Sequence, residues 1–435
     1  MTIDLAQVAK DKNIQYFLIS FVDMQGALRA KLVPASAIAD MQADGAGFAG
    51  FAAWMDMTPA YPDMMAVPDP ASLIQIPWKP EVGWLASDLH MDGQPVEESP
   101  RVVLKRQVEA ARAEGYRLMS GVECEFFLIK GDELALADSQ DTATKPCYDQ
   151  LALMRQYDII KEICDSMQTL GWGPYQNDHE DGNGQFEMNW GFADALVTAD
   201  RHAFFKYMVK TIAEAHGLRA TFMPKPFANL TGNGCHAHVS LWDAKGRRNL
   251  FEDGNDALGM TPLAYNFLGG VMQHADGLAS IFTPSVNSYK RIDATVTLSG
   301  ATWSPNAISY SGNNRTHMVR IPGPGRFEMR LMDGAANPYL LQAGVLAAGL
   351  DGVEHGRDPG KPLHINMYEE GQRLKRVRRL PLNLLDAIRL TDKNKTLRRR
   401  LGDKFVDSHV KMQLDTWRRY ATSLSRWEID NTLDC

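Results

Sequence analysis

The sequence at residues 122–126 is Val-Glu-Cys-Glu-Phe, in which apolar and acidic side chains alternate. A β-strand places successive side chains on opposite faces. The three apolar side chains of this stretch would therefore pack into a core, while Glu123 and Glu125 would face a cavity. The stretch predicts a strand with acidic side chains on one face and apolar side chains on the other.

Three other stretches alternate in the same way. They are Gln-Phe-Glu-Met-Asn-Trp at residues 185–190, Cys-His-Ala-His-Val-Ser at 235–240 and Arg-Phe-Glu-Met-Arg-Leu at 326–331. We expect all four to lie in one sheet, with their polar rows around a shared cavity. Those rows contain Gln185, Glu187, His236, His238, Arg326, Glu328 and Arg330.

Such a cavity would be electrostatically unfavourable without a cation. Crowded carboxylates repel one another at low dielectric and raise each other's pKa. Carboxylate oxygens with one imidazole suit Mg²⁺ or Mn²⁺ better than zinc, which prefers sulfur and nitrogen. Each stretch alone could be an amphipathic strand with a hydrated face, but the four together predict a divalent metal site.

Composition limits the class of protein. The chain has 435 residues, is 45% hydrophobic and carries a formal charge of -7, so it can bury a large core and lacks the positive charge that binds nucleic acid or anionic membranes. Its five cysteines include no Cys-x-x-Cys pair, which favours a reduced compartment. The N-terminus does not resemble a signal peptide, and the most apolar window, residues 339–350, is too short to cross a bilayer. We expect a soluble, cytoplasmic protein.

The pattern along the chain predicts an α+β fold with two domains. Two strands joined at Gln25-Gly26 occupy residues 15–34, a loop follows at 44–50, and residues 91–100 read as a linker. We therefore expect a small domain at residues 1–99 and a larger one at 100–435. Helices are expected in the larger domain at residues 102–114, 154–170, 201–216 and from 396 onward.

Phosphate binding is expected to depend on arginines. The glycines at residues 45–50 match the dinucleotide fingerprint by letter but lack a preceding strand and a following helix, and a Walker lysine loop is absent. Four arginines lie close in sequence to Glu328, and guanidinium groups match phosphate oxygens. Structural ion pairs are the alternative for these four arginines: Arg315, Arg320, Arg326 and Arg330.

The ordered motifs together resemble the glutamine synthetase family over the chain from about residue 15 to its end. The motifs are Ser-Gly-Val-Glu-Cys-Glu-Phe-Phe from residue 120, His-Glu at 179 with Gly-Gln-Phe-Glu from 184, Met-Pro-Lys-Pro from 223, Gly-Asn-Gly-Cys-His-Ala-His from 232, Asn-Ser-Tyr-Lys-Arg from 287, Asn-Arg at 314, Arg-Phe-Glu-Met-Arg from 326 and Ala-Ala-Asn-Pro-Tyr from 335.

The resemblance implies an architecture and an assembly. The expected fold is a small N-terminal β-grasp domain followed by a larger catalytic domain, in which helices flank a curved antiparallel sheet. The expected assembly is a homo-oligomer, a dodecamer of two hexameric rings with active sites between subunits.

The resemblance also implies ligands for each site residue. L-glutamate would bind at Arg291, Arg315, Arg330, Gly232 and Asn233. Two or more Mg²⁺ or Mn²⁺ ions would be held by two ligand sets, the first being Glu125, Glu180 and Glu187, and the second Glu123, His236 and Glu328. The co-substrate ATP would contact His238, Ser240, Arg320, Arg326, Phe192 and Trp242. Catalytic roles would fall to Arg291, Arg315, Arg330, Glu180 and Asp293.

The implied reaction is ATP-dependent formation of an amide. Transfer of the γ-phosphoryl group to the side-chain carboxylate of L-glutamate would give γ-glutamyl phosphate, and an amine would then displace phosphate. Family members close this site with a short flap that carries a glutamate, whereas residues 292–314 contain only one acid, Asp293. The family's ammonium-binding aspartate in the N-terminal domain is also missing, at residues 48–51.

These departures favour an amine larger than ammonia. A pocket of Phe51, Trp54, Trp303 or Tyr310 could bury a methyl group, which contributes about 0.8 kcal/mol. The pattern resembles the type III-like branch of the family, whose members include enzymes that join methylamine to glutamate and give γ-glutamylmethylamide, ADP and phosphate. Glutamine synthesis from ammonia and ligation of other alkylamines or polyamines are the alternatives. A guanidino-kinase-like phosphotransferase is a further alternative, and a non-catalytic relative should have lost its metal ligands.

Overall fold

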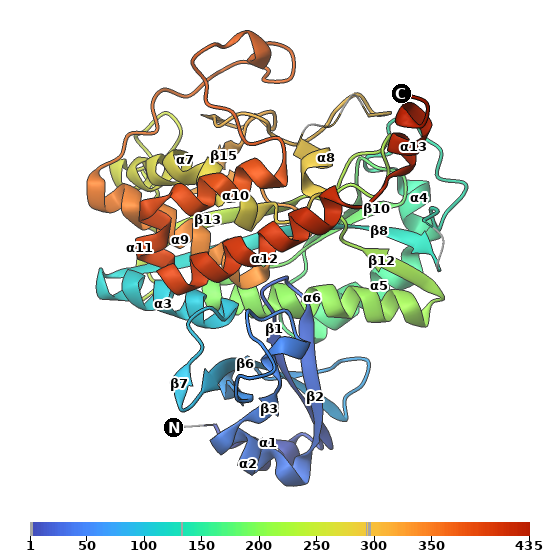
Figure 1. Cartoon of the computed structure of the whole chain (residues 1–435), viewed down its shortest axis with the longest axis vertical. Coiled ribbons are helices and arrows are strands. Elements are labelled where there is room, and N and C mark those ends of the chain that lie inside the picture. The colour runs from blue at the N-terminus through green and yellow to red at the C-terminus, as the bar shows by residue number, and fades with distance from the viewer. Residues whose placement is uncertain (1–2, 132–133, 293, 295–296) are drawn as a thin grey trace.

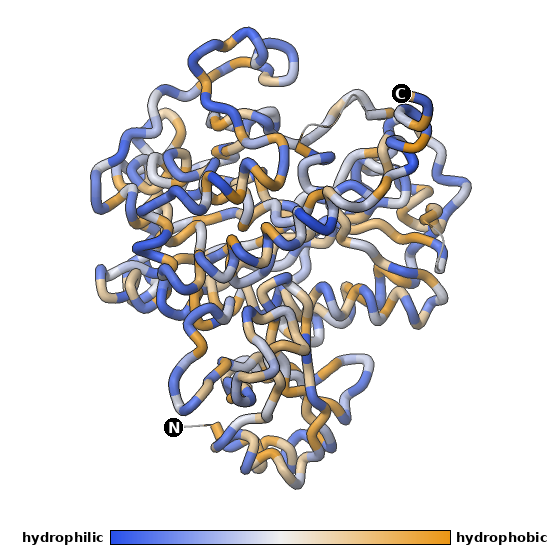
Figure 2. The backbone as a smooth tube through the Cα atoms, in the orientation of Figure 1, coloured by the Kyte–Doolittle hydropathy of each residue, from blue (hydrophilic) through white to orange (hydrophobic). Residues whose placement is uncertain are grey.

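The structure is a computed structural model that describes residues 3–131, 134–292, 294 and 297–435. Two sheets organise the chain, and the N-terminal sheet lies below the larger body in Figure 1. Hydrophilic stretches of the backbone gather on outer helices and loops, and hydrophobic ones on the inner strands (Figure 2). The expected α+β class is confirmed.

The N-terminal sheet has the strand order β2-β1-β6-β4-β3, with β5 and β7 paired to β6. The expected hairpin is present, because β1 (Tyr16–Val22) pairs antiparallel with β2 (Leu28–Pro34) and Gly26 takes a left-handed φ of 84° at the turn. The expected loop at residues 44–50 is wrong in part, since it contains the strand β3. The other elements here are α1 (Leu5–Asp11), α2 (Ile38–Asp44), β3 (Ala46–Phe48), β4 (Met64–Pro68), β5 (Ile74–Gln75), β6 (Val82–Met91) and β7 (Gln94–Pro95).

The second sheet has the order β14-β15-β16-β13-β8-β10-β9, with β11 and β12 also paired to β8. All four alternating stretches lie in it, on β8, β10, β13 and β16, as the alternation predicts. Its strands are β8 (Tyr116–Lys130), β9 (Gln176–His179), β10 (Gln185–Asn189), β11 (Ala193–Asp194), β12 (Leu218–Thr221), β13 (Cys235–Asp243), β14 (Tyr310–Ser311), β15 (Val319–Gly323) and β16 (Arg326–Met329).

Helices cover the apolar face of this sheet. Phe126 of β8 packs against Phe205 of α6 with ring centroids 6.5 Å apart, and Phe327 of β16 lies 6.2 Å from Phe267 of α7. The opposite face is left open for polar side chains. The helices are α3 (Pro100–Ala113), α4 (Gln150–Arg155), α5 (Tyr157–Thr169), α6 (Ala195–Ala215), α7 (Pro262–Phe282), α8 (Ser288–Ile292), α9 (Pro338–His355), α10 (Leu384–Lys393), α11 (Lys395–Leu401), α12 (Asp403–Ala421) and α13 (Arg426–Thr432).

Helix boundaries differ from the sequence expectation at three places. The helix expected at 154–170 is two helices that meet at Gln156, and the helix expected from residue 201 begins at Ala195, capped by Asp194. The C-terminal region forms three helices, because Gly402 takes a left-handed φ of 94° between the first two.

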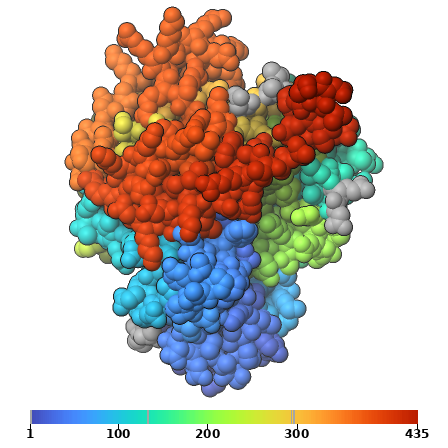
Figure 3. Space-filling view, viewed as in Figure 1, coloured from blue at the N-terminus to red at the C-terminus, as the bar shows by residue number. Residues whose placement is uncertain are grey.

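Charged contacts join the N-terminal sheet to the larger body. Arg101 of α3 is buried and forms ion pairs with Asp69 at 2.8 Å, Asp88 at 2.7 Å and Asp200 of α6 at 3.0 Å. The space-filling view shows the C-terminal helices lying directly against the N-terminal part (Figure 3), where Lys411 pairs with Asp56. The division into 1–99 and 100–435 stays a prediction. Among the described residues, no helix is both long and apolar enough to cross a lipid bilayer.

Candidate active site

The register of the second sheet brings the reactive side chains together. Glu187 of β10 lies opposite Glu125 of β8, and His236 of β13 lies opposite Glu123. Directly opposed residues of antiparallel strands share a face. The polar rows expected from the alternation therefore converge on one face, beside the strand that carries Glu328.

Three carboxylates form the first candidate metal site. Glu125, Glu180 and Glu187 each offer an oxygen, and these atoms lie within 4.8 Å of one another. Burial, together with the charge of Glu125, raises the pKa of Glu180 well above its usual range, and burial with Glu123 does the same for Glu187. Burial raises the pKa of Glu125 to about 7 despite the nearby guanidinium of Arg291. The raised pKa values favour the protonated form of all three carboxyl groups, and a divalent cation would displace those protons.

The second candidate site contains His236, Glu123 and Glu328. His236 Nδ1 lies 3.6 Å from a carboxylate oxygen of each glutamate. These separations exceed a hydrogen bond and are close to the roughly 3–3.5 Å between two ligand atoms on one ion of Mg²⁺, Mn²⁺ or zinc size. Burial and Arg330 lower the pKa of His236 to about 4, so the imidazole is neutral and available as a ligand. The residues fit the metal implied by the family.

Arginines neutralise Glu328 in this structure. Its two oxygens accept hydrogen bonds from Arg330 Nη1 at 2.5 Å and Arg320 Nη1 at 2.8 Å. Burial alone would raise the pKa of Glu328, but Arg330 and His236 hold it at about 2. The carboxylate is therefore ionised at neutral pH, as a metal ligand must be.

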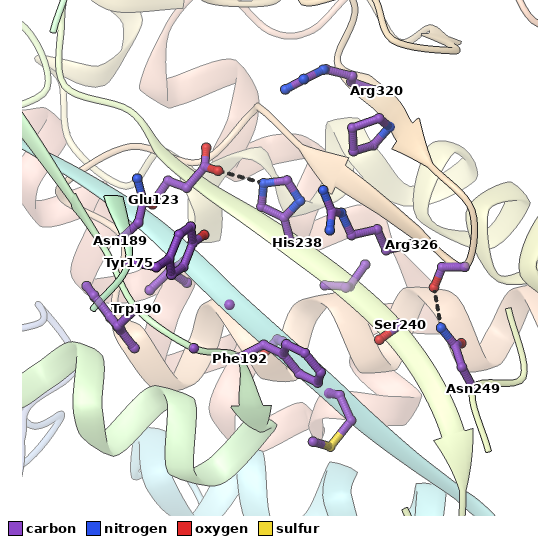
Figure 4. Close-up of a pocket in the computed structure, with 18 of the residues that line it drawn as sticks. Glu123, Tyr175, Asn189, Trp190, Phe192, His238, Ser240, Asn249, Arg320 and Arg326 are labelled. Carbon is purple, nitrogen blue, oxygen red and sulfur yellow. Dashed lines mark hydrogen bonds and ion pairs between the residues drawn. The ribbon is translucent and has the colours of Figure 1, made fainter. Parts of the chain in front are cut away.

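A cavity of about 590 Å³ opens beside the second ligand set (Figure 4). Sequence reasoning missed Tyr175, Asn189 and Asn249, which also line it, because they lie outside the alternating rows or do not ionise. Glu123 reaches the cavity wall, so the candidate metal site and the cavity are continuous. The wall contains all six residues predicted to contact ATP, namely His238, Ser240, Arg320, Arg326, Phe192 and Trp242.

The family resemblance predicts that His238 contacts ATP. The structure also places it beside Glu123 and Glu328 of the second candidate metal site. Its Nε2 donates a hydrogen bond of 2.8 Å to Glu123, and it forms a compact group with Glu123 and Glu328. Figure 4 shows the imidazole between Glu123 and the arginines. His238 therefore lies between the second ligand set and the arginines of the large cavity.

Two of the predicted glutamate-binding residues, Arg291 and Gly232, lie close to each other beside the first candidate metal site. Arg291 is buried, and a Cβ atom added to Gly234 would lie 3.0 Å from Arg291 Nη2 and 2.9 Å from Glu125 Oε1. A Cβ at Gly232 would lie 3.2 Å from the Arg291 side chain. Both glycines allow the close approach of this arginine. The resemblance assigns Gly232 to glutamate binding and gives Gly234 no role.

Asn233 and Gln185 fix the loop that follows Gly232. Asn233 Nδ2 donates to the carbonyls of Thr221 and Met223, and its Oδ1 accepts from Gln185 Nε2 at 3.0 Å. Gln185 Nε2 also donates to Glu125 at 3.0 Å. Both polar atoms of the Asn233 side chain therefore hydrogen-bond within the protein. A contact between Asn233 and the substrate would use its backbone atoms.

Three predicted catalytic residues differ in position. Arg330 is buried and lies one residue past the end of β16, whereas Arg315 is exposed at the rim of the large cavity. Asp293 lies outside the described residues. Tyr310, expected in an amine pocket, lies elsewhere: its hydroxyl donates to Gly360 O at 2.6 Å and it lines a separate cavity.

Asp178 is an acid that sequence reasoning missed. It lies on β9 directly opposite Glu187, and burial together with Glu125 and Glu123 raises its pKa to about 6. Its stretch, Gln-Asn-Asp-His, is polar throughout, so alternation gave no signal. Asp178 is therefore a carboxylate beside both ligand sets and a member of neither.

A hydrogen-bonded latch connects the segment after Arg291 to the site. Asp181, next to Glu180, is buried, and its Oδ2 accepts from Thr231 Oγ1 at 2.7 Å, Trp303 Nε1 at 2.7 Å and the Ser299 hydroxyl. Two of the three donors belong to the segment where family members have the flap. The indole of Trp303 is thereby held beside the first candidate metal site.

Comparison with known proteins gives consistent matches. Residues 97–432 match the family model described as glutamine synthetase, catalytic domain. A protein of Rhizobium leguminosarum bv. phaseoli named glutamine synthetase is 60% identical over 434 residues, covering 100% of both chains. Glutamate–methylamine ligase of Methyloversatilis universalis is 44% identical over 437 residues, covering 98% of each. The solved structure titled "GmaS/ADP complex-Conformation 1" has a TM-score of 0.96 and 61% identity over 100% of both chains. The chain belongs to the glutamine synthetase family of ATP-dependent ligases.

Proposed function

We propose that this chain ligates methylamine to the γ-carboxylate of L-glutamate, consuming ATP and giving γ-glutamylmethylamide, ADP and phosphate. The observation that carries the ligase chemistry is the convergence of six metal-ligand side chains beside an arginine-lined cavity of about 590 Å³. The match to glutamate–methylamine ligase at 44% and to GmaS at 61% identity supports the choice of amine.

The residues divide into two metal-ligand sets. We propose one ion among Glu125, Glu180 and Glu187 and a second among the remaining ligands, Glu123, His236 and Glu328. Either Mg²⁺ or Mn²⁺ suits these donors, and the ions would neutralise phosphate oxygens during transfer.

Arginines would hold the reactants in line. Arg320 and Arg326 line the cavity from β15 and β16 and would bind the phosphates of ATP, while Arg291 would bind the carboxylate of glutamate. Arg315 at the rim and Arg330 beside Glu328 would neutralise charge on the transferred phosphoryl group. The glutamate carboxylate attacks the γ-phosphorus, ADP leaves, and the amine nitrogen then displaces phosphate from the acyl carbon.

The amine must lose a proton before it attacks, because an alkylammonium has no free electron pair. Asp178, beside the first ligand set, and Glu180, a member of it, are carboxylates with raised pKa values. We propose Asp178 as the proton acceptor because it belongs to neither ligand set. The mechanism predicts that Asp178→Asn lowers turnover while nucleotide binding is retained.

An apolar wall would favour methylamine over ammonium. The latch holds Trp303 beside the site, and residues 292–314 contain no glutamate to bind a small hydrated cation. One buried methyl contributes about 0.8 kcal/mol, a roughly fourfold preference. Glutamine synthesis remains the second candidate, because a relative that carries that name is 60% identical.

We further propose a homo-oligomer, a dodecamer of two hexameric rings in the cytoplasm. Phe51 and Trp54 are 53% and 44% exposed on the N-terminal domain, where they could complete the site of a neighbouring subunit. The five cysteines are free thiols, as in a reducing compartment. Light scattering should give about twelve times the 48.5 kDa chain mass.

Steady-state kinetics test the proposed reaction. Phosphate release should require L-glutamate, an amine and Mg²⁺ or Mn²⁺ together, and kcat/KM should be higher for methylamine than for ammonium. Full-rate release without any amine would support a phosphotransferase instead. A preference for ammonium would assign the chain to glutamine synthesis.

A further inference from the structure

A second cavity, of about 450 Å³, lies where the two sheets meet. It is enclosed by the β1–β2 turn, by helix α6 and by residues 222–224 that follow β12. Figure 1 shows α6 directly above the N-terminal strands. None of the residues that line this cavity lines the 590 Å³ cavity of the candidate active site.

Three cations line this junction cavity. Lys206 and Lys210 lie one turn apart on α6, with their ammonium groups 5.5 Å and 5.9 Å from the ring centroid of Phe222, and Arg219 comes from β12. Lys206 donates to the carbonyl of Gly334 at 2.7 Å. Within the part of the chain that the structure describes, none of the three forms an ion pair.

The cations are in an unfavourable arrangement without a counter-charge. Glu214 is the one acid among the described residues that line the cavity. Burial, followed by repulsion from Lys206 and Arg219, lowers the pKa of Lys210. A local excess of positive charge also contrasts with the formal charge of -7 on the whole chain. A bound anion would relieve the repulsion.

The remaining lining limits the kind of anion. Phe222, Met223 and Pro224 give the cavity an apolar wall, and its volume is at the lower end of the roughly 300–1,000 Å³ usual for small-molecule sites. We propose that the junction cavity binds a small polyanion that carries two or three carboxylate or phosphate groups on a compact skeleton. This site is separate from the proposed reaction and does not depend on it.

Calorimetry on the intact, metal-free protein tests this site. Citrate and pyrophosphate serve as probes of the two anion chemistries, each titrated into wild type and into the double variant Lys210→Met/Arg219→Gln. The double variant removes two charges and keeps the side-chain bulk over Phe222. We expect it to weaken the tighter-bound probe at least tenfold. The matched control, Lys245→Met/Arg247→Gln, removes two exposed charges from the turn after β13 and should leave the affinity unchanged.

Four results would overturn the proposal, the last of them obtained with a further variant. One is that neither probe binds wild type, and another is that the double variant binds as tightly as wild type. The third is loss of the native assembly mass in the double variant by light scattering, since Lys210 and Arg219 would then belong to a subunit contact. The Arg326→Gln variant distinguishes the sites further, because binding lost there would place the probe in the large cavity.

Discussion

At the scale of single residues, Asp181 shows how a side chain outside the ligand sets shapes the site. One of its oxygens accepts hydrogen bonds from Thr231, Ser299 and Trp303, so one carboxylate ties the loop before β13 to the segment after Arg291. A hydrogen bond to a charged group contributes about 1.5–3 kcal/mol. The latch is therefore strong enough to keep the indole of Trp303 in place.

The latch predicts a selective change in amine affinity. Trp303→Phe keeps an aromatic ring and loses the bond to Asp181, so KM for methylamine should rise about tenfold, as roughly 1.4 kcal/mol requires. KM for ATP should stay the same, because the 590 Å³ cavity proposed to bind ATP does not include Trp303. Trp242→Phe, a change in the lining of that cavity, is the matched control. The prediction fails if Trp303→Phe alters KM for ATP and leaves that for methylamine unchanged.

Glu125 predicts how stability depends on pH without metal. Its folded-state pKa is about 7, above its ordinary value of 4.5, so the proton it binds stabilises the fold below pH 4.5 and this contribution is lost as pH rises through 7. In EDTA, Tm should fall between pH 6 and 8, and Mg²⁺ or Mn²⁺ should restore it most at pH 8. His236 acts in the opposite direction, but only below its ordinary pKa of 6.5.

The variant Glu125→Gln isolates that contribution. It keeps the shape of the side chain and cannot ionise, so the fall in Tm between pH 6 and 8 should be smaller than in wild type. Differential scanning fluorimetry in EDTA measures both slopes. Equal slopes for the two proteins would show that Glu125 does not carry the raised pKa.

At the scale of elements, strand β8 contributes both ligands and open space. Gly121 lies opposite His238 in the register and lines the large cavity, and an added Cβ would sit 3.5 Å from Phe192. Gly121→Ala makes only an ordinary contact there. Gly121→Leu would project a larger side chain into the cavity beside Phe192, and we expect it to raise KM for ATP more than tenfold while Gly121→Ala changes it little. Equal KM values in both variants would place the nucleotide elsewhere.

The alternating stretches could be predicted because they combine two signals. Two signals mark four of their residues: each is a possible metal ligand, and each lies in the row of polar side chains at every second position of its stretch. The structure places them on one face of the sheet, as both signals predict. They are Glu123, Glu187, His236 and Glu328. Asp178 could not be predicted, since its strand is polar throughout and its importance arises from register with β10. A strand without an apolar row gives no indication in the sequence of which of its side chains face the site.

Helix ends and short strands were the weaker predictions for a related reason. The break at Gln156 and the strand β3 at residues 46–48 depend on packing against other elements, which a single segment does not reveal. The capping residue Asp194 could have predicted the start of α6, but the predicted helix began at residue 201. The local sequence thus predicts the strands of the candidate active site better than it predicts the ends of the surrounding helices.

At the scale of the whole molecule, Arg101 joins the N-terminal sheet to helix α6 of the larger body. It is 3% exposed and pairs with Asp69 and Asp88 on the N-terminal side and with Asp200 on α6, which also accepts a hydrogen bond from Tyr339 at 2.7 Å. Removing one partner of a buried ion pair costs about 3–5 kcal/mol, because it leaves the opposite charge unpaired.

The Arg101→Met variant should therefore lower the free energy of unfolding by about 3–5 kcal/mol. Urea unfolding followed by tryptophan fluorescence measures the change. Lys105→Met is the matched control, since Lys105 is half-buried and pairs with Asp88 alone, and it should cost about 1 kcal/mol or less. Equal losses in the two variants would show that the network around Arg101 does not join the N-terminal sheet to helix α6.

Six side chains, supplied by strands β8, β10, β13 and β16 and by Glu180 just after β9, are proposed to hold two divalent ions against the phosphates of ATP. Crystals grown with Mn²⁺ and a non-hydrolysable ATP analogue test this arrangement directly through anomalous scattering. We expect one manganese peak among Glu125, Glu180 and Glu187 and another among Glu123, His236 and Glu328, with the triphosphate in the large cavity. Manganese peaks away from these side chains, or a nucleotide bound outside that cavity, would contradict the account.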